Sequence, residues 1–419
     1  MLNGRPFRFG GANIYWLGLD ENTGTVAYPT RFRIDDALET AKDMDATVVR
    51  AQTLGISTGN ALSVEPALGK FNPRAFAPID YSVYRAGQLG LKLVIPLTDY
   101  WNYYHGGVYS FTNWLGQPPC HQADCPAQAR FFYTSPAAIT AFEQYIRHLL
   151  NHVNAYTGVP YKADPAIMSW ELGNELNGMP RSWITAVAAF IHRLAPHQLV
   201  SAGQQAGIGQ AALSAPGVDI IDVHYYPPVI SRIESDAARV TAAGQAYIAG
   251  EYGSTSASRR LLAAMAADRH ISGAAFWSLF AHNDATGYVQ HRDGFTLHYP
   301  GDTAGMRRDG QVIRQFDVGM TEGGRGAVPP PPAPGRPLIT SIGQRGGKYV
   351  IAWRGATDAG TYSVQRSVSG PSGPWLTICR YCAASALRAG RAQRAAQWYR
   401  VIPYTLQGLP GPASAPAAT

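Results

Sequence analysis

Residues 164–175 read Asp-Pro-Ala-Ile-Met-Ser-Trp-Glu-Leu-Gly-Asn-Glu. A proline precedes an apolar run of strand length, and the run ends in a glycine and two polar residues. This pattern is typical of a buried parallel strand that delivers side chains to a site. Active sites of β/α barrels lie at the carboxyl ends of the strands, so Asn174 and Glu175 are candidate functional residues. An ordinary strand with a solvated Glu175 at its end fits these local residues equally well.

Short apolar runs alternate with segments of helical periodicity up to about residue 318, which predicts a parallel sheet covered by helices. We expect strands at 7–14, 46–52, 92–98, 167–175, 199–204, 220–226, 247–252 and 273–279. We expect helices at 33–44, 79–89, 136–155, 182–195, 233–243 and 259–268. Eight such units predict an α/β fold, the (β/α)8 TIM barrel. An open doubly wound sheet is the alternative, but Gly10-Gly11-Ala12-Asn13 opens no helix, as a phosphate-binding turn would.

The chain after the barrel has a different composition. Residues 321–337 contain Gly323-Gly324-Arg325-Gly326 and four consecutive prolines from Pro329, which predicts a semi-rigid linker. Residues 338–419 contain short predicted strands at 349–353, 361–366, 375–379 and 398–401, with Trp353, Tyr362 and Tyr399 as the core of a small β-sandwich. We therefore assign residues 1–320 to the barrel. The last segment resembles a fibronectin type III module, and we expect it to act as a spacer or a weak binding module.

The composition favours a secreted enzyme and argues against nucleic-acid binding and membrane insertion. Hydrophobic residues make up 46% and charged residues only 15%, with 44 glycines and 30 prolines, which suits a secreted enzyme with many loops. The net charge of +7 would fit an anionic partner, but the basic residues form no run longer than pairs such as Arg259-Arg260. Nucleic-acid binding is therefore not expected. No apolar run approaches the roughly 20 residues of a membrane-spanning helix, so we expect no membrane partner.

Four cysteines form two close pairs, Cys120 with Cys125 and Cys379 with Cys382. Short spacings in loop-like surroundings predict two local disulfides in an oxidising compartment, secreted or periplasmic. A metal site is the alternative, because Cys-x-x-Cys is half a zinc site and His105 and His121 lie near the first pair. The sequence enters strand-like residues directly after Met1 without a signal peptide, so we expect that any export leader is absent from it.

The longest connection, residues 100–135, carries a high density of aromatic residues: Trp101, Tyr103, Tyr104, Tyr109, Phe111 and Trp114. Loops longer than roughly 12 to 15 residues are usually functional or disordered, and aromatic residues argue against disorder. We expect this connection to form one wall of a cleft. A satellite hydrophobic cluster closed by the first cysteine pair is the alternative.

A second carboxylate, Glu251, ends the apolar run that starts at Tyr247. Two glutamates at the carboxyl ends of different barrel strands can face each other across the barrel mouth. Glycoside hydrolysis needs such a pair, because one group protonates the leaving oxygen while the other attacks the sugar or activates water; it requires no metal or cofactor. The alternative is that both are structural charges at strand ends.

Other predicted strand ends carry residues that suit the same chemistry. Arg50 ends the second strand, where a buried guanidinium can fix and ionise a carboxylate. His224 and Tyr226 place both side chains on one face of the sixth strand, which in a barrel is the pocket face. The tyrosine can stabilise Glu251, and the histidine can orient a donor or bind substrate. Trp277 offers an apolar face for a sugar ring.

The segment Trp170-Glu171-Leu172-Gly173-Asn174-Glu175 resembles the fourth-strand signature of family five glycoside hydrolases. Residues 154–165 are similar to the endo-β-1,4-mannanase branch of that family. The resemblance extends over nearly all of residues 4–300. It includes residues 97–101 followed by Gly106-Gly107, then His224-Tyr225-Tyr226-Pro227, Gly250-Glu251-Tyr252-Gly253 and Phe276-Trp277.

The resemblance implies a retaining mechanism, with Glu175 as acid/base and Glu251 as nucleophile. Asn174 would bind the 2-hydroxyl of the sugar. The other residues implied in substrate binding are Arg50, Trp101, His224, Tyr226 and Trp277. We expect carboxyl groups about 5 to 5.5 Å apart. We also expect a raised pKa for Glu175 and an ionised Glu251 beside Arg50.

Two departures from the family pattern fall in loops that shape substrate binding. Leu176 and Asn177 follow the acid/base where the family usually has proline and many mannanases then have arginine. Asp99 and Tyr100 stand where the third-strand motif usually has asparagines. Our prediction is a monomeric enzyme, without cofactor or metal, that cuts β-1,4-mannan internally. An exo-acting β-mannosidase, a β-1,4-glucanase and a catalytically silent carbohydrate-binding barrel are the alternatives.

Overall fold

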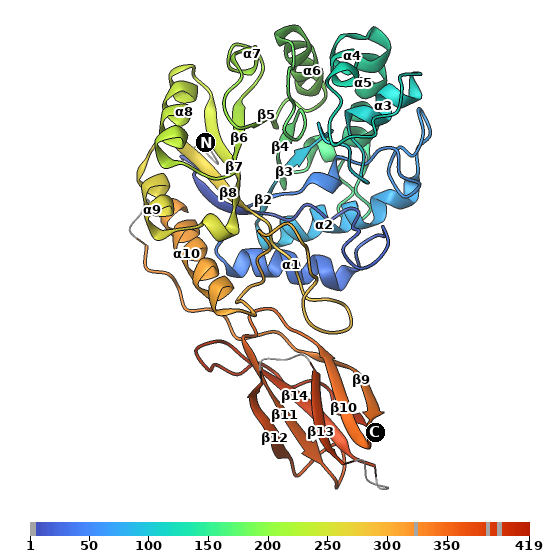
Figure 1. Ribbon diagram of the computed structural model, residues 1–419, viewed down its shortest axis with the longest axis vertical. Helices are drawn as coiled ribbons and strands as arrows, with labels where there is room; N and C mark the ends of the chain where they lie inside the picture. The colour runs from blue at the N-terminus through green and yellow to red at the C-terminus, as the bar shows by residue number, and fades with distance from the viewer. Residues whose placement is uncertain (1–5, 322–325, 383–385, 392–395) are drawn as a thin grey trace.

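The computed structural model describes residues 6–321, 326–382, 386–391 and 396–419. Within these ranges, eight parallel strands close into a barrel in chain order (Figure 1). They are β1 (Phe9–Asn13), β2 (Val48–Arg50), β3 (Lys92–Pro96), β4 (Ile167–Glu171), β5 (Leu199–Gln205), β6 (Ile220–Tyr225), β7 (Ala246–Gly253) and β8 (Ile271–Trp277). Pairing of β1 with β8, with Gly11 opposite Ala275, closes the ring. The predicted TIM barrel is confirmed, and the open-sheet alternative is wrong.

Helices cover the outside of the barrel, which explains why the strands are apolar on both faces. The helices are α1 (Arg31–Asp43), α2 (Phe76–Leu89), α5 (Pro136–Asn151), α6 (Arg181–Leu194), α7 (Gln210–Leu213), α8 (Ile230–Ala242), α9 (Arg259–Ala267) and α10 (Ala304–Thr321). Short 3-10 turns lie at Gln52–Leu54, Pro73–Ala75, Tyr161–Ala163 and Ser254–Ser256. Local signals set the helix ends: the Thr30 side chain accepts from the Arg33 amide at the start of α1, and Gly90 ends α2 at φ 73°.

The connection 100–135 contains two helices that were not predicted. They are α3 (Val108–Trp114) and α4 (Pro126–Thr134), whose Phe111 and Phe132 rings lie 5.5 Å apart. Both rings belong to the main barrel core rather than to a satellite cluster. These helices are short and their apolar faces are completed by α5 and α6, so the local sequence alone gave little helical periodicity.

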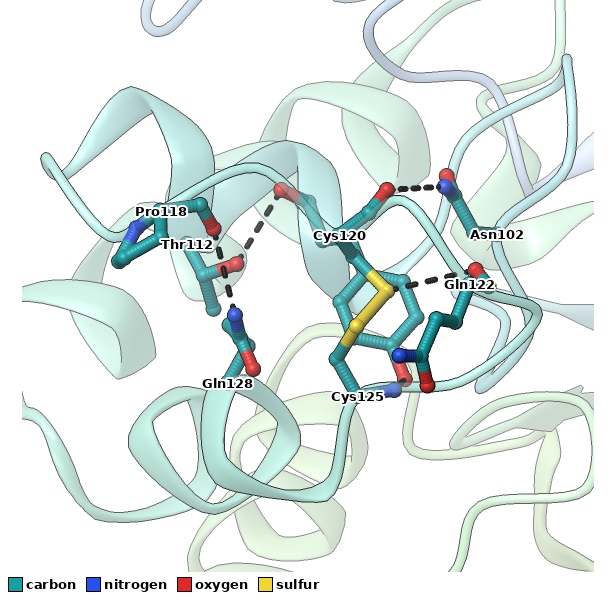
Figure 2. Close-up of a disulfide and its surroundings, with 8 residues drawn as sticks. Asn102, Thr112, Pro118, Cys120, Gln122, Cys125 and Gln128 are labelled. Atoms are coloured by element: carbon teal, nitrogen blue, oxygen red, sulfur yellow. Dashed lines mark hydrogen bonds between the residues drawn. A yellow bond between two sulfur atoms is a disulfide. The ribbon is translucent and has the colours of Figure 1, made fainter.

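The predicted Cys120–Cys125 disulfide closes the turn between α3 and α4 (Figure 2). The Cys120 carbonyl accepts from Asn102 Nδ2 at 2.7 Å, and the Cys125 amide donates to the Tyr109 hydroxyl at 2.7 Å. Cys379 and Cys382 are also joined. Both predicted pairs are therefore disulfides, and the zinc alternative is wrong.

The C-terminal part forms two antiparallel sheets, in the strand orders β13-β10-β9 and β12-β11-β14-β15. The strands are β9 (Leu338–Arg345), β10 (Lys348–Arg354), β11 (Thr361–Ser367), β12 (Leu376–Cys382), β13 (Ala386–Arg391), β14 (Trp398–Tyr404) and β15 (Ala417–Ala418). Trp353, Tyr362 and Tyr399 are buried together in their core, as predicted. Of the predicted linker, residues 322–325 lie outside the described residues, and residues 326–337 contain no helix or strand.

Among the helices that the structure describes, none combines the length and the apolar character needed to cross a lipid bilayer.

Candidate active site

A pocket of about 530 Å³ opens at the carboxyl ends of the barrel strands. Six of the predicted site residues line it: Trp101, Asn174, Glu175, Tyr226, Glu251 and Trp277. Arg50 and His224 are buried and contact the two lining glutamates from within the barrel. The fold therefore brings together all eight residues that the sequence singled out, although they come from β2, β6, β7, β8 and the loops after β3, β4 and β6.

Glu175 does not belong to a strand, which corrects the predicted strand end. β4 ends at Glu171, and the chain then turns so that Glu175 adopts a left-handed conformation with φ 52°. A Cβ atom at Gly173 would lie 2.8 Å from Thr98 Cγ2, so only glycine fits the turn without displacement of a neighbour. A non-glycine residue in this conformation is a strained position of the kind found at functional sites. The turn directs the Glu175 carboxylate into the pocket.

Two donors hold the Glu175 carboxylate. Trp101 Nε1 donates to Oε2 at 2.6 Å, and His224 Nδ1 lies 2.8 Å from Oε1. Both partners are among the predicted site residues. Trp101 was expected to bind substrate, and the structure adds that its indole N–H fixes the candidate acid/base.

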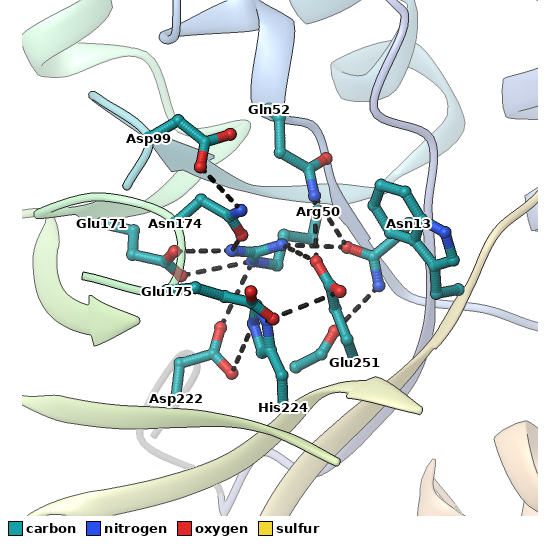
Figure 3. A network of polar contacts seen from close by, with 12 residues as sticks. Asn13, Arg50, Gln52, Asp99, Glu171, Asn174, Glu175, Asp222, His224 and Glu251 are labelled. Atoms are coloured by element: carbon teal, nitrogen blue, oxygen red, sulfur yellow. Dashed lines mark hydrogen bonds and ion pairs between the residues drawn. The ribbon is translucent and has the colours of Figure 1, made fainter. Parts of the chain in front are cut away.

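Three donors hold the Glu251 carboxylate, and Figure 3 shows two of them, Arg50 and Gln52. Arg50 Nη1 donates to Oε1 at 2.6 Å, Gln52 Nε2 donates to the same oxygen at 3.1 Å, and the Tyr226 hydroxyl donates to Oε2 at 2.9 Å. The expected contacts of Arg50 and Tyr226 with this carboxylate are confirmed. Gln52, which was not predicted, lies two residues after Arg50 in the first turn beyond β2.

The two carboxylates lie close together. One oxygen of Glu175, one oxygen of Glu251 and a ring nitrogen of His224 all lie within 4.8 Å of one another. These atoms could also hold a metal ion, but each of the three side chains already has hydrogen-bonding or ionic partners inside the protein. The arrangement thus resembles a pair of facing carboxyl groups joined by an imidazole.

Arg50 anchors a wider network beneath the pocket (Figure 3). Its guanidinium lies 2.6 Å from Glu171 and 3.3 Å from Asp222, and it donates to Asn174 Oδ1 at 2.8 Å. Glu171 and Asp222 are fully buried and were missed. A sequence signal existed for both, because Asp222 precedes His224 by two residues and so shares its strand face, and Glu171 is an acidic residue inside an apolar run.

Trp277 forms an aromatic platform supported from two sides. The Tyr15 ring stacks on it at 5.3 Å and 14°, and Trp277 Nε1 donates to Asp293 Oδ2 at 2.5 Å. Tyr15 and Asp293 also line the pocket, and both were missed. Asp293 lies in the long segment after β8, where the loop residues follow no periodic pattern that would mark them.

Residues 1–226 match the sequence profile of a family described as GH family 5 beta-mannosidase-like. The chain belongs to glycoside hydrolase family 5. This confirms the resemblance stated from the strand-end motifs, and the matched residues include the acid/base candidate Glu175.

The chain is also similar in sequence to mannan-active relatives, and it shares its fold with a solved structure. A putative mannan endo-1,4-beta-mannosidase P of Arabidopsis thaliana is 30% identical over 220 residues, covering 51% of each chain. A mannan endo-1,4-beta-mannosidase 1 of Oryza sativa subsp. japonica is 28% identical over 257 residues, covering 54% of this chain and 57% of that protein. The chain thus spans about half the length of the curated relatives it matches. The endo-beta-1,4-mannanase structure from Thermotoga petrophila shares the fold, with a TM-score of 0.62 and 21% identity over 100% of this chain and 98% of that one.

In this family 5 chain, burial and the acidic neighbours set the charge of the Arg50 network. Burial raises the pKa of Glu171 to about 8, the Asp222 carboxylate adds to this rise, and Arg50 opposes it. Burial also acts to raise the pKa of Asp222, but hydrogen bonding and charge from His224, with the charge of Arg50, outweigh it and lower that pKa. Of the two buried carboxylates beside Arg50, Glu171 therefore has the greater tendency to hold a proton and Asp222 the greater tendency to be ionised.

The raised pKa expected for the family 5 acid/base candidate Glu175 is wrong. Burial acts to raise the pKa of Glu175, but the hydrogen bond and charge of His224 and the Trp101 donor outweigh it, so this pKa lies below its ordinary value. Burial raises the pKa of Glu251 above its ordinary value despite His224 and Arg50. Neither the charge and hydrogen bond of His224 at Glu175 nor the desolvation of Glu251 is visible in the sequence.

His224 carries a positive charge at neutral pH. Burial acts to lower its pKa, but Glu251 and the hydrogen bonds to Asp222 and Glu175 raise the pKa to about 10. The proton therefore resides in the hydrogen bond between His224 and Glu175, nearer the imidazole in the free enzyme.

Proposed function

We propose that this chain is a retaining β-glycoside hydrolase that cleaves β-1,4-mannan or related mannosides by double displacement. The observation that supports this best is the approach of Glu175 and Glu251 oxygens to within 4.8 Å. Retaining enzymes have carboxyl groups about 5 to 5.5 Å apart, whereas inverting enzymes need roughly 6.5 to 9.5 Å to admit a water molecule. The close pair favours direct attack by one carboxylate on the sugar.

In the first step, a Glu251 oxygen forms a bond to the anomeric carbon while the glycosidic bond breaks. Glu175 delivers a proton to the leaving oxygen, and a glycosyl ester of Glu251 remains. In the second step, Glu175 takes a proton from water, whose oxygen attacks the anomeric carbon and releases Glu251. The proton that Glu175 delivers in the first step comes from His224, along the 2.8 Å hydrogen bond between the two side chains. Two inversions give net retention.

The network prepares both groups for these roles. Arg50, Gln52 and Tyr226 fix the Glu251 carboxylate, so its attack needs little reorganisation. Asn174 is oriented by Arg50 and by its Nδ2 contact to Asp99 at 3.2 Å, and we assign it to the 2-hydroxyl of the sugar. Trp277 is the platform on which the sugar ring stacks.

The choice of mannan rests on the family and on the mannan endo-1,4-beta-mannosidases that the chain is similar to over half of their length. We propose internal cleavage of β-1,4-mannan. Exo-acting β-mannosidase action or β-1,4-glucanase action is the alternative within the class. A catalytically silent carbohydrate-binding barrel is disfavoured, because a pure binder has no need for two facing carboxylates with this set of donors.

We also propose the chain organisation and location. Residues 1–320 would be the catalytic barrel, 321–337 a linker and 338–419 a fibronectin type III-like sandwich. The antiparallel sheets of the C-terminal part support the last assignment. The two disulfides support a secreted or periplasmic protein, because such bonds persist in oxidising compartments. A monomer that acts on a polysaccharide without a cofactor completes the proposal.

The test combines a nucleophile variant with product analysis. We expect Glu251→Ala to abolish hydrolysis of mannan and of aryl β-mannosides, while Glu234→Ala, an exposed glutamate on α8, retains wild-type rates. The first-formed product of the wild type should be the β-anomer by NMR. Hydrolysis that survives unchanged in Glu251→Ala would contradict the nucleophile assignment, and release of only mannose from mannan would contradict internal cleavage.

A further inference from the structure

The long segment between β8 and α10, residues 278–303, contacts the active-site pocket with one part and the C-terminal sheets with another. His291, Asp293 and Phe295 line the active-site pocket. Another part of the segment, around His282 and Ala285, contacts the C-terminal sheets. In Figure 1 this gold segment runs from the barrel mouth towards the β-sandwich. One continuous piece of chain therefore touches both the substrate site and the C-terminal part.

At the pocket end, the segment fixes the aromatic platform. Asp293 Oδ2 accepts from Trp277 Nε1 at 2.5 Å, and Asp293 Oδ1 accepts from the Phe295 amide at 2.8 Å. His291 adds a contact of 3.3 Å from Nε2 to Asp293, and its Nδ1 lies 2.8 Å from Asn22 Oδ1. The orientation of the Trp277 indole thus depends on where this segment lies.

At the other end, a single buried carboxylate joins three parts of the molecule. Asp36 of α1 accepts from the His282 amide at 2.8 Å and contacts His282 Nδ1 at 2.9 Å. Its other oxygen accepts from Thr357 Oγ1 of the C-terminal part at 3.1 Å. All three side chains are buried. Since a buried carboxylate is costly without its donors, this junction fixes the segment between the barrel and the sheets.

Gly355 lies directly against the His282 ring. A Cβ atom at Gly355 would lie 2.1 Å from His282 Cδ2, closer than any real contact, so the ring would have to move. The same ring stacks on Tyr288 at 4.1 Å, and Tyr288 stacks on His298 at 4.4 Å. A displacement of His282 would therefore disturb the packed Tyr288 and His298 rings within the same segment.

Additional contacts hold the sheets against the same region. Thr340 Oγ1 of β9 donates to the Ala285 carbonyl at 2.8 Å, and the Arg354 guanidinium lies 3.6 Å from the centre of the Phe32 ring in α1. These contacts come from both β9 and β10. The attachment is thus broad and does not depend on one hydrogen bond.

We propose that the C-terminal sheets are a structural part of the active site: Gly355 and Thr357 position the 278–303 segment so that Asp293 holds Trp277 as a sugar platform. Gly355 and Thr357 are positioning residues, because neither lines the pocket. This inference rests on the proposed function for its kinetic consequence. It replaces the expectation of a spacer or weak binding module with a role in substrate placement.

The kinetic test compares two glycine-to-alanine substitutions, made at different positions of the full chain. Gly355→Ala forces His282 to shift, whereas Gly343→Ala in β9 places its Cβ where no atom lies within 4 Å. We expect Gly355→Ala to lower kcat/KM on the order of tenfold, mainly through KM, because a platform displaced by a fraction of an ångström binds sugar less well. Gly343→Ala should keep wild-type values. Thr357→Val, a milder variant should Gly355→Ala fail to fold, should lower kcat/KM roughly threefold.

A double-mutant cycle separates positioning from general damage to the fold. If Gly355 acts through Asp293, the Gly355→Ala effect should largely disappear in an Asp293→Ala background. Hydrogen–deuterium exchange of the 288–297 peptide should increase in Gly355→Ala and stay unchanged in Gly343→Ala. Independent, multiplicative effects in the cycle, or unchanged exchange in Gly355→Ala, would overturn the inference.

The exchange measurement does not depend on catalysis. If the wild type hydrolyses no β-mannoside, the proposed function fails, and the exchange of the 288–297 peptide alone decides whether the sheets position the segment. Increased exchange in Gly355→Ala then supports the positioning, and unchanged exchange overturns it.

Discussion

Nδ1 of His224 lies 2.8 Å from Oε1 of Glu175. Because the pKa of His224 is raised and that of Glu175 is lowered, the two side chains together hold one proton at neutral pH. The acid of the proposed reaction is therefore this pair rather than an isolated glutamic acid. As the leaving oxygen gains negative charge, the proton can pass along the hydrogen bond that already exists.

The alkaline limb of the pH profile should follow this pair. We expect kcat/KM of the wild type to fall with an apparent pKa of about 10, where the pair loses its proton. His224→Ala removes the main donor that lowers the Glu175 pKa, so the alkaline limb should move towards neutral pH. We also expect kcat/KM to fall by roughly 10²- to 10⁴-fold. An alkaline limb that stays in place in His224→Ala would contradict the shared proton.

The acidic limb should respond to Tyr226. Tyr226→Phe removes the hydroxyl that donates to Glu251 at 2.9 Å, so the already raised Glu251 pKa should rise further and the acidic limb should move to higher pH. We expect kcat/KM to fall on the order of 10²-fold. Tyr225→Phe is the matched control, because the Tyr225 hydroxyl contacts Asp236 and Tyr247 instead. In the control, the acidic limb should lie at the same pH as in the wild type, and the free energy of unfolding should fall by only about 1 kcal/mol.

Stability should depend on pH through Asp358, at the junction of barrel and sheets. Burial, a hydrogen bond with Asp43 and the charge of Asp43 raise the pKa of Asp358 to about 9, while Arg314 opposes the rise and Asp36 adds to it. In the unfolded chain this pKa is about 3.9. The folded state therefore binds the extra proton, and the associated stability is complete below about pH 4. It is lost as pH rises through about 9.

Asp358→Asn should flatten this dependence. An amide can donate to Asp43 at every pH, and asparagine tolerates the left-handed φ of 63° at this position. We expect the unfolding temperature of the variant to exceed that of the wild type at pH 8 and to approach it at pH 4, measured by calorimetry. If the substitution changes the unfolding temperature by the same amount at pH 8 and at pH 4, proton binding by Asp358 is not the cause of the pH dependence.

The Cys120–Cys125 disulfide should affect substrate binding as well as stability. Ala123, within the bridged turn, lines the pocket, and its carbonyl accepts from the Asn102 amide at 2.9 Å. Replacing both cysteines with alanine should cost roughly 2 kcal/mol of stability through the unfolded chain, and should raise KM. Alanine at both Cys379 and Cys382, the control, should lower stability while KM stays unchanged. Equal KM values in both double variants would exclude a link between the turn and the pocket.

The sequence predicted the barrel and its candidate carboxylate pair because both depend on local signals. Apolar runs of strand length, such as residues 167–171, occur at the spacing of a β/α repeat, and a polar residue at the end of such a run marks the pocket. Glu175, Glu251 and His224 were found in this way. Helices α3 and α4 were missed because their apolar faces are completed by distant partners such as Phe142 and Trp183.

Charge states and loop contacts could not be predicted from the sequence. The lowered pKa of Glu175 depends on His224, which is 49 positions away, and on the carboxylates that keep His224 charged. Asp293 reaches Trp277 from an aperiodic segment, and Asp36 meets Thr357 across 321 positions. These contacts are properties of the folded arrangement, and no pattern within a sequence window identifies them.

The lack of a side chain at Gly355 has a consequence for protein engineering. The site where the His282 ring rests against the backbone of the C-terminal part leaves no space for another atom. The sheets therefore cannot be exchanged as an independent cassette in chimeric enzymes without also exchanging the segment that follows β8. Insertions in that segment and substitutions at the end of β10 should be selected together, so that directed evolution of substrate range is best carried out on both regions at once.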